Sequence, residues 1–118
     1  MRVVVTGTRE GRPDLVPWLV RFTDKHGIPE LFVLGCARGV DAQALRLCHE
    51  RRWSHAVVFA DWALGKAAGH QRNQRMVDLA TVGDWCLAFP GGASVGTWDC
   101  VRRAKAAGLQ VAVLTVRR

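Results

Sequence analysis

The sequence predicts an α/β fold, a doubly wound three-layer sandwich in which helices cover both faces of a mainly parallel five-stranded sheet. Five short apolar runs are separated by segments in which apolar residues recur at helical spacing. The runs are continuously apolar and do not alternate with polar residues, as expected for strands buried on both faces. Because strands and helices alternate along the chain, we expect right-handed crossovers and one parallel sheet.

The first half of the chain contains three of the expected strands. These strands are expected over residues 2–6, 31–34 and 55–59, with helices over residues 14–26 and 40–52. In the first helix, Pro13 and Pro17 fall in the first turns and Gly27 follows the last turn, which are the positions that these residues favour. The second helix ends at Arg51 and Arg52, where cations are favourable.

The second half is expected to supply two further strands, over residues 84–89 and 110–116, and two helices, over residues 72–80 and 97–107. Residues 60–71 show neither a helical nor a strand period, so we expect a long loop there. Loops of this length in compact domains often carry function. Arg117 and Arg118 are expected to form a charged tail.

The composition indicates one domain over residues 1–118 with an anionic partner. The chain has 118 residues, of which 49% are hydrophobic and only four are proline, so it can bury one core and is not disordered. Its net charge is +7, and arginine is the main cation. Guanidinium groups bind phosphate well, so the partner is expected to be a nucleotide, a nucleic acid or an acidic protein. Charge alone does not choose among these three.

The four cysteines indicate neither a metal site nor disulfide bonds. Cys36, Cys48, Cys86 and Cys100 stand singly, without a C-x-x-C pair or a histidine at zinc-finger spacing. We expect each to pack as a small apolar residue in a reducing compartment, and we expect no metal and no organic cofactor. The apolar stretch after Met1 is too short for a signal sequence or a membrane span, so we expect a cytoplasmic protein without a membrane partner.

The segment after the fourth strand has the composition of a phosphate-binding loop. Pro90, Gly91, Gly92, Gly96 and Thr97 follow an apolar run and precede a helix. Glycine permits positive φ and lets a ligand approach backbone N–H groups, and Thr97 is placed to cap the helix, whose N-terminus attracts anions. A strand-to-helix turn that needs glycine only for its shape is an alternative of equal weight.

Further candidate ligand-binding residues follow the first three strands, at the ends where open α/β sheets bind ligands. They are Gly7, Thr8 and Arg9, then Gly35, Cys36, Arg38, Gly39 and Asp41, and beyond the third strand Trp62. A plain turn with a solvated arginine is the alternative at Arg9, and Trp62 is expected either to stack on a base or to fill the core. Arg72 and Asn73 are expected at the start of a helix, where a cation opposes the helix dipole and a bound anion would relieve the conflict.

Together, these segments resemble the small single-domain proteins related to YspA and YpsA in the SLOG superfamily. Those proteins look like G-S-R, G-A-R-G-x-D, A-D-W-x-x-x-G-x-A-A-G-x-x-R-N and F-P-G-G-x-G-T, and this chain has counterparts at residues 7–9, 36–41, 60–73 and 89–97. The superfamily also includes the LOG phosphoribohydrolases and the Rossmann domain of the DNA-processing protein DprA. The resemblance covers nearly the whole chain and implies a Rossmann-like fold with strand order 3-2-1-4-5.

The leading hypothesis is a module that binds a nucleotide or a nucleotide-derived ligand. The expected roles are phosphate binding by the backbone of Gly91, Gly92, Gly96 and Thr97, charge neutralisation by Arg9, Arg38 and Arg72, ribose binding by Asp41 or Asp99, and base binding by Asn73 or Trp62. Related folds often form dimers, so a homodimer is compatible with the resemblance.

Two other functions remain open at the level of sequence. One is a LOG-like phosphoribohydrolase, which cleaves the N-glycosidic bond of a nucleoside 5′-monophosphate, with Arg72 and Asp99 as catalytic residues. Cys100 stands where the LOG motif has glutamate, and three residues separate Gly92 from Gly96 where LOG proteins usually have one, so we expect weak or no hydrolysis. The other is DprA-like binding of single-stranded DNA. Grooves that bind single strands usually interleave aromatic residues with cations, whereas the tryptophans of this chain are scattered, which argues against this function.

Overall fold

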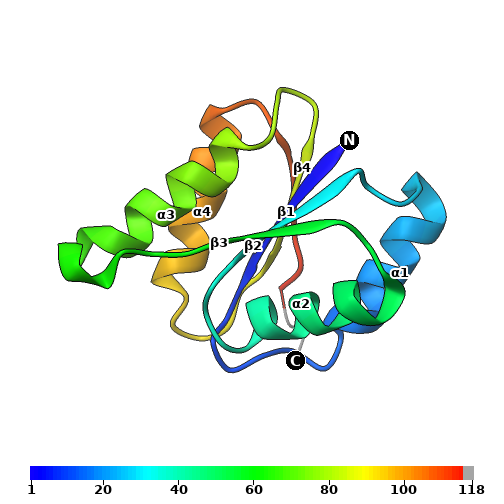
Figure 1. The fold of residues 1–118 in the computed structure, drawn as a ribbon, viewed down its shortest axis with the longest axis horizontal. Coiled ribbons are helices and arrows are strands. Elements are labelled where there is room, and N and C mark those ends of the chain that lie inside the picture. Colours follow the sequence, from blue (N-terminus) through cyan, green and yellow to red (C-terminus); the bar gives the residue numbers. More distant parts are fainter. Residues whose placement is uncertain (116–118) are drawn as a thin grey trace.

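The computed structural model describes residues 1–115, which form a five-stranded sheet with helices on both faces (Figure 1). The strands are β1 (Arg2–Gly7), β2 (Leu31–Gly35), β3 (His55–Val58), β4 (Trp85–Phe89) and β5 (Gln110–Val113). Their order is β3-β2-β1-β4-β5, and every neighbouring pair is parallel. The predicted Rossmann-like α/β fold and its strand order are therefore confirmed.

Two α-helices cover each face of the sheet. Helices α1 (Leu15–His26) and α2 (Val40–Arg51) pack together on one face, and α3 (Ala67–Asp78) and α4 (Val95–Ala106) on the other, as Figure 1 shows. A short 3₁₀ turn, η1 (Trp62–Leu64), precedes α3. Within residues 1–115, no helix has both the length and the apolar character that crossing a membrane requires.

Alternate residues of the central strands divide between two hydrophobic cores. Val3 and Val5 face α1 and α2, whereas Val4 and Val33 face α3 and α4. Val4 is central to the sheet, since it pairs in register with Val33 of β2 and with Cys86 of β4. Because both faces of these strands are covered, apolar residues occupy consecutive positions along them, which explains the continuous runs in the sequence.

Several element boundaries differ from those expected. Helix α3 begins at Ala67 and not at residue 72, so the segment 60–71 is only partly a loop. Helix α4 begins at Val95 instead of residue 97, and β5 ends at Val113. The expected strand residue 116 and the tail of Arg117 and Arg118 lie outside the described residues.

The strand order creates a crevice at the carboxyl ends of β1 and β4. β1 and β4 are neighbours, but the helices that follow them, α1 and α4, lie on opposite faces of the sheet. The two connections diverge at the carboxyl ends of these strands and leave space between them. In open α/β sheets, ligands bind at such a point.

Candidate functional site

A cavity of about 320 Å³ lies at the carboxyl ends of β1 and β4. Its wall is built from the end of β1 and the loop after it, the start of α4 and the two residues before that helix, one residue of α2 and one of α3. The lining residues are Thr6, Gly7, Thr8, Arg9, Glu10, Asp41, Arg72, Ala93, Ser94, Val95, Gly96 and Thr97. Seven of the residues that the sequence singled out, from four separate segments, therefore meet around one space.

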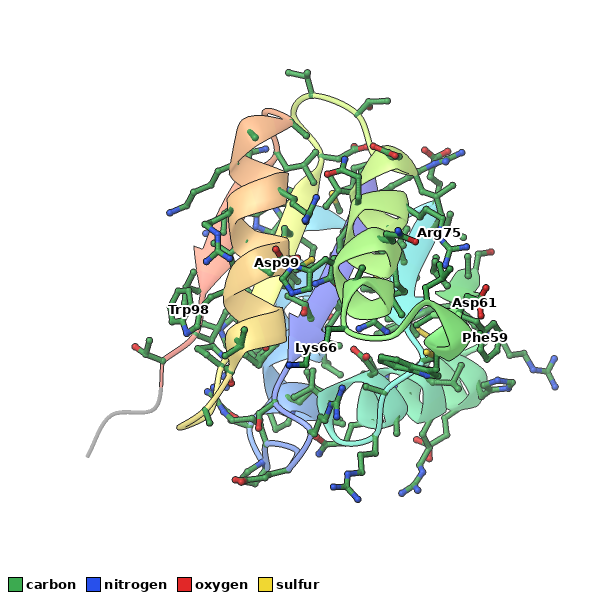
Figure 2. All side chains as sticks on the ribbon, turned by 90° about the vertical axis from the view of Figure 1, so that its left-hand side faces the viewer. Phe59, Asp61, Lys66, Arg75, Trp98 and Asp99 are labelled. Atoms are coloured by element: carbon green, nitrogen blue, oxygen red, sulfur yellow. The ribbon has the colours of Figure 1, made fainter. Side chains whose placement is uncertain are left out.

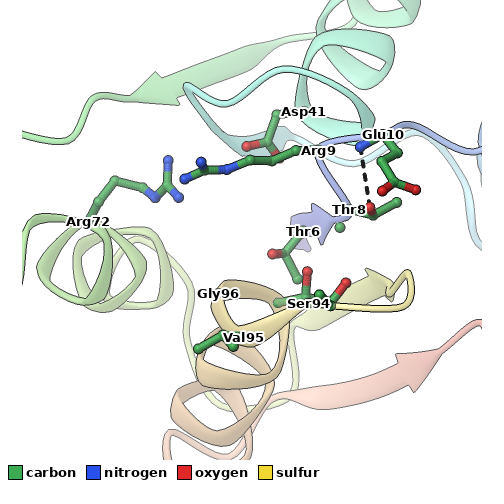
Figure 3. Close-up of a pocket in the computed structure, with 12 residues that line it drawn as sticks. Thr6, Thr8, Arg9, Glu10, Asp41, Arg72, Ser94, Val95 and Gly96 are labelled. Atoms are coloured by element: carbon green, nitrogen blue, oxygen red, sulfur yellow. Dashed lines mark hydrogen bonds between the residues drawn. The ribbon is translucent and has the colours of Figure 1, made fainter. Parts of the chain in front are cut away.

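Two arginines face each other across this cavity. The side chains of Arg9 and Arg72 extend toward one another, as Figure 3 shows. Arg72 is only 8% exposed, whereas Arg9 is exposed. Among residues 1–115, neither guanidinium forms an ion pair with a carboxylate. Two facing cations, one of them buried, repel each other unless an anion lies between them.

Arg72 is held in place by neutral groups. Its Nε donates to Oδ1 of Asn73 at 3.1 Å and its Nη1 to Sγ of Cys36 at 3.5 Å, while Nη2 has no partner within the described chain. The expectation that Arg72 lies near a helix start was wrong, because α3 begins at Ala67 and Arg72 lies in its middle. The positive charge of Arg72 is therefore unfavourable because it is buried beside Arg9, and not because of the dipole of its own helix.

Asp41 is a carboxyl group of the cavity wall on which the charges of both arginines act. A Cβ atom on Gly35 would lie 2.6 Å from Oδ2 of Asp41 and 2.8 Å from Nη1 of Arg72, so the bare glycine leaves room for both side chains. Burial raises the pKa of Asp41 to about 6, although the charge of Arg72, a hydrogen bond from the Ala37 N–H and the charge of Arg9 oppose the rise. This pKa lies about two pH units above the usual value for an aspartate.

The N-terminus of α4 presents its first turn to the cavity. Ser94, not Thr97, is the N-cap residue, and its Oγ accepts a hydrogen bond from Gly91 N at 2.6 Å instead of capping the helix. Thr97 is buried in the first turn, so its expected capping role was wrong. Because no side chain caps α4, its first N–H groups remain available to an anion.

The glycines of the loop after β4 do not adopt positive φ, contrary to expectation. Gly91 is required by close approach instead, since a Cβ atom there would lie 2.7 Å from Oγ1 of Thr8. Gly92 and Gly96 have no atom within 4 Å of such a Cβ position. Pro90, Gly91 and Gly92 line a neighbouring hollow together with Trp98, so only the Gly96 end of the loop lines the cavity.

Asn73 and Asp99 lie between α3 and α4 and do not line the cavity. Asn73 is 2% exposed, and its Nδ2 donates to Oδ2 of Asp99 and to the Gly96 carbonyl, both at 3.0 Å. Asp99 also pairs with Arg103 at 2.9 Å and His70 at 3.1 Å. Figure 2 shows Asp99 between the two helices. Neither residue is open to a ligand base or sugar.

The pKa of Asp99 is shifted in the opposite direction from that of Asp41. Burial acts to raise the pKa of Asp99, but hydrogen bonds from Arg103 and Asn73 and the charges of Arg103 and His70 hold it below its usual value. The carboxylate is therefore ionised and occupied by its neighbours. We assign it to packing of α3 against α4.

The remaining candidate residues lie at or near a second hollow beside the cavity. This hollow is lined by Arg9, Ala37, Arg38 and Trp62. Trp62 is 56% exposed, so the expectation that it fills the core was wrong. Gly39 has φ +75° and packs on the backbone of Thr8 and Arg9, which is a structural requirement for glycine.

The chain is 39% identical to the gene 61 protein of Mycobacterium phage D29 over 118 residues, and the alignment covers 93% of each chain. The chain belongs to the family of that phage protein. No protein-family model and no solved structure matches it. The name of the gene 61 protein states no ligand, so the functional conclusion for this member of its family rests on the cavity.

Sequence reasoning missed several residues of the cavity and its surroundings in this member of the gene 61 family. Thr6, Glu10, Ala93, Ser94 and Val95 line the cavity. Arg12 was also missed; it is buried and donates to the carbonyls of Pro90 at 3.0 Å and Leu114 at 2.5 Å, joining three strand ends. Glu10 and Arg12 could have been proposed as site residues because they are close to Arg9 in the sequence.

Proposed function

We propose that the cavity binds the phosphate of a nucleotide or nucleotide-derived ligand. The observation that carries the proposal is the buried guanidinium of Arg72, which has no carboxylate partner in residues 1–115 and faces Arg9. A phosphate between the two arginines would neutralise both and would accept charge-assisted hydrogen bonds from them. The uncapped first turn of α4 would donate N–H groups to the same phosphate.

The other polar groups of the cavity suit the rest of a nucleotide. Thr6 and Thr8 carry hydroxyl groups that can donate to phosphate oxygens. Asp41 can accept from a ribose hydroxyl when ionised and can donate to a phosphate oxygen when protonated. This proposal includes membership of the SLOG superfamily and a cytoplasmic location.

The geometry does not favour the phosphoribohydrolase alternative with Asp99 as the acid. Asp99 is 4% exposed, is turned to α3 and is surrounded by the side chains of Arg102, Arg103 and His70. A group in that position reaches neither a sugar nor a water molecule in the cavity. We therefore propose binding and not hydrolysis.

The proposal is tested with two variants of one helix, Arg72→Met and Arg75→Met. Both lose one positive charge, but Arg75 is exposed and donates to the Phe59 carbonyl outside the cavity. By calorimetric titration with inorganic pyrophosphate and AMP, Arg72→Met should weaken binding by about 1.5–3 kcal/mol, which is roughly ten- to 150-fold. Arg75→Met should bind like the wild type.

The thermal unfolding temperature without ligand provides the control for folding. Arg72→Met keeps the apolar stem and removes a buried cation without a carboxylate partner, so we expect little loss of stability. If the folded variant bound both probes as tightly as the wild type, the phosphate site would lie elsewhere and the proposal would be wrong.

A further inference from the structure

The hollow at Trp62 and the cavity share one residue. Arg9 lines the cavity with Arg72 and also lines the hollow with Arg38 and Trp62. The two spaces therefore meet at the Arg9 side chain. A ligand that fills the cavity and is long enough to pass Arg9 would reach the Trp62 ring.

Local structure holds the Trp62 ring at the surface. Oδ1 of Asp61 accepts from Ala63 N at 3.2 Å, and Gly65 N donates to the Trp62 carbonyl at 3.1 Å, which closes the 3₁₀ turn. Cη2 of Trp62 lies 4.0 Å from the position of a Cβ on Gly69 in α3, so one edge of the ring rests against that helix. An ordered tryptophan that is 56% exposed can stack on an aromatic ligand group.

The cations around Trp62 are also without partners. Arg38 and Arg9 are both exposed, and within residues 1–115 neither side chain takes part in an ion pair. Arg9 thus lines two spaces, one with Arg72 and one with Arg38. A single phosphate in the cavity would leave the second space empty.

We propose that the ligand is a nucleoside diphosphate, bound with its terminal phosphate in the cavity and its base on Trp62. This inference rests on the proposed function. The terminal phosphate lies between Arg72, Arg9 and the start of α4, the second phosphate lies between Arg9 and Arg38, and the base stacks on the tryptophan ring. Within residues 1–115, Arg72, Arg9 and Arg38 form no ion pair and Trp62 stacks on no other ring, so each of the three ligand groups would meet such a side chain.

A terminal phosphate suits the cavity better than the backbone of a nucleic acid. Arg72 is 8% exposed and Thr6 is 7% exposed, so the anion position lies deep in the wall. The terminal phosphate of a nucleoside diphosphate has three free oxygens and one anhydride bond to the next phosphate, whereas an internal phosphodiester carries a sugar on each side. A nucleoside diphosphate can therefore reach Arg72 by its free end, whereas a nucleic acid strand would need a second opening through which its backbone could leave the cavity.

The test compares ADP, GDP, AMP, GMP and inorganic pyrophosphate as probes by calorimetric titration. For the wild type, each diphosphate should bind at least tenfold tighter than its monophosphate. Arg38→Gln should reduce this ratio to below threefold while monophosphate affinity stays constant. Trp62→Ala should weaken nucleotide binding about tenfold and leave pyrophosphate binding unchanged, whereas Trp62→Phe should retain most of the affinity because it retains a ring.

Matched controls are Arg46→Gln and Trp98→Ala. Arg46 is exposed on α2 and lines another hollow, and Figure 2 shows Trp98 on the far side of α4 from Phe59 and Asp61. Both variants should bind every probe as the wild type does. Thermal unfolding without ligand checks that all variants are folded.

The outcomes separate this inference from the proposed function. If Arg72→Met lost binding but Arg38→Gln and Trp62→Ala did not, the phosphate site would stand and the diphosphate inference would be overturned. Binding of a thymidine oligonucleotide more tightly than either diphosphate, with a steep salt dependence, would also overturn it in favour of single-stranded DNA. If no probe bound the wild type, both proposals would fail.

Discussion

Asp41 lines the cavity with Arg72, and Asp99 contacts Asn73, the residue next to Arg72; both aspartates are buried, but their surroundings differ. Asp99 accepts from Asn73 and pairs with Arg102, Arg103 and His70, and its pKa is lowered. Asp41 accepts one backbone hydrogen bond, from Ala37, and burial raises its pKa to about 6. Charges that are saturated within the protein stabilise the packing of α3 on α4, whereas the unsaturated charges around Asp41 mark the place for a ligand.

Asn73 joins the two regions. Its Oδ1 accepts from Nε of Arg72, while its Nδ2 donates to Asp99 and to the carbonyl of Gly96. One amide therefore fixes the cavity arginine relative to the start of α4. The paired charges around Asp99 therefore hold Asn73 in place, and Asn73 in turn holds Arg72 at the cavity.

The largest effect is expected from Asp99→Asn, which breaks the ion pairs of Asp99 with Arg102 and Arg103 within α4 and its contact with His70 of α3. The free energy of unfolding at pH 7 should fall by about 2–3 kcal/mol, less than for fully buried pairs because the partner cations are partly exposed. Because the native pKa of Asp99 is lowered, its stabilisation is present above the unfolded pKa of about 4 and is lost as the pH falls through the native value.

Denaturant unfolding between pH 3 and pH 7 measures this effect, with Asp78→Asn as the control. Asp78 is exposed near the end of α3 and accepts only from Gln74 in the described chain, so its variant should change stability by less than about 0.5 kcal/mol. A variant Asp99→Asn as stable as the wild type at pH 7 would refute the packing role.

Asp41→Asn should change stability in the opposite direction. A native pKa near 6 means that the stability contributed by protonated Asp41 is complete below about pH 4 and is lost as the pH rises through 6. The neutral amide avoids that loss and keeps an acceptor for the Ala37 N–H. We expect the variant to be more stable than the wild type by about 1–2 kcal/mol at pH 7 and equally stable at pH 4.

The same denaturant titrations, run at both pH values, measure the difference. Equal stability at pH 7, or a loss there, would show that Asp41 is ionised without cost in the free protein. The contrast between the two aspartates would then disappear.

The fold was predictable from the sequence, but the helix that carries Arg72 was only partly so. Strand ends were predictable because the apolar runs stop abruptly at Gly7, Gly35 and Phe89, and strand order brings those ends together. The start of α3 was missed because its inward face carries Ala68, Arg72 and Asn73, which do not form an apolar period.

The roles of the acidic and glycine residues also required the structure. Asp41 and Asp99 both occur early in a helix, so their sequence positions do not tell which one is surrounded by cations. Glycine at 91 is explained by the nearness of Thr8, a contact between segments far apart in the chain. Sequence spacing could place these residues near one edge of the sheet but could not tell ligand-facing groups from packed ones.

The smallest effect is expected in an assay for hydrolysis. Because Asp99 is occupied within the α3–α4 contact, incubation with a panel of nucleoside 5′-monophosphates should release no free base above the buffer control. Chromatography of the products measures the base. Turnover that is abolished in a folded Asp99→Asn protein and retained by Cys100→Ser would show that Asp99 is a catalytic acid.

The most direct test of the phosphate site is a comparison of Gly96→Val with Gly92→Val. Both glycines have open space at the Cβ position, but only Gly96 lines the cavity. Titration with inorganic pyrophosphate should show at least tenfold weaker binding for Gly96→Val and wild-type binding for Gly92→Val, with both proteins unfolding near the wild-type temperature. Wild-type affinity in a folded Gly96→Val protein would contradict phosphate binding at the start of α4.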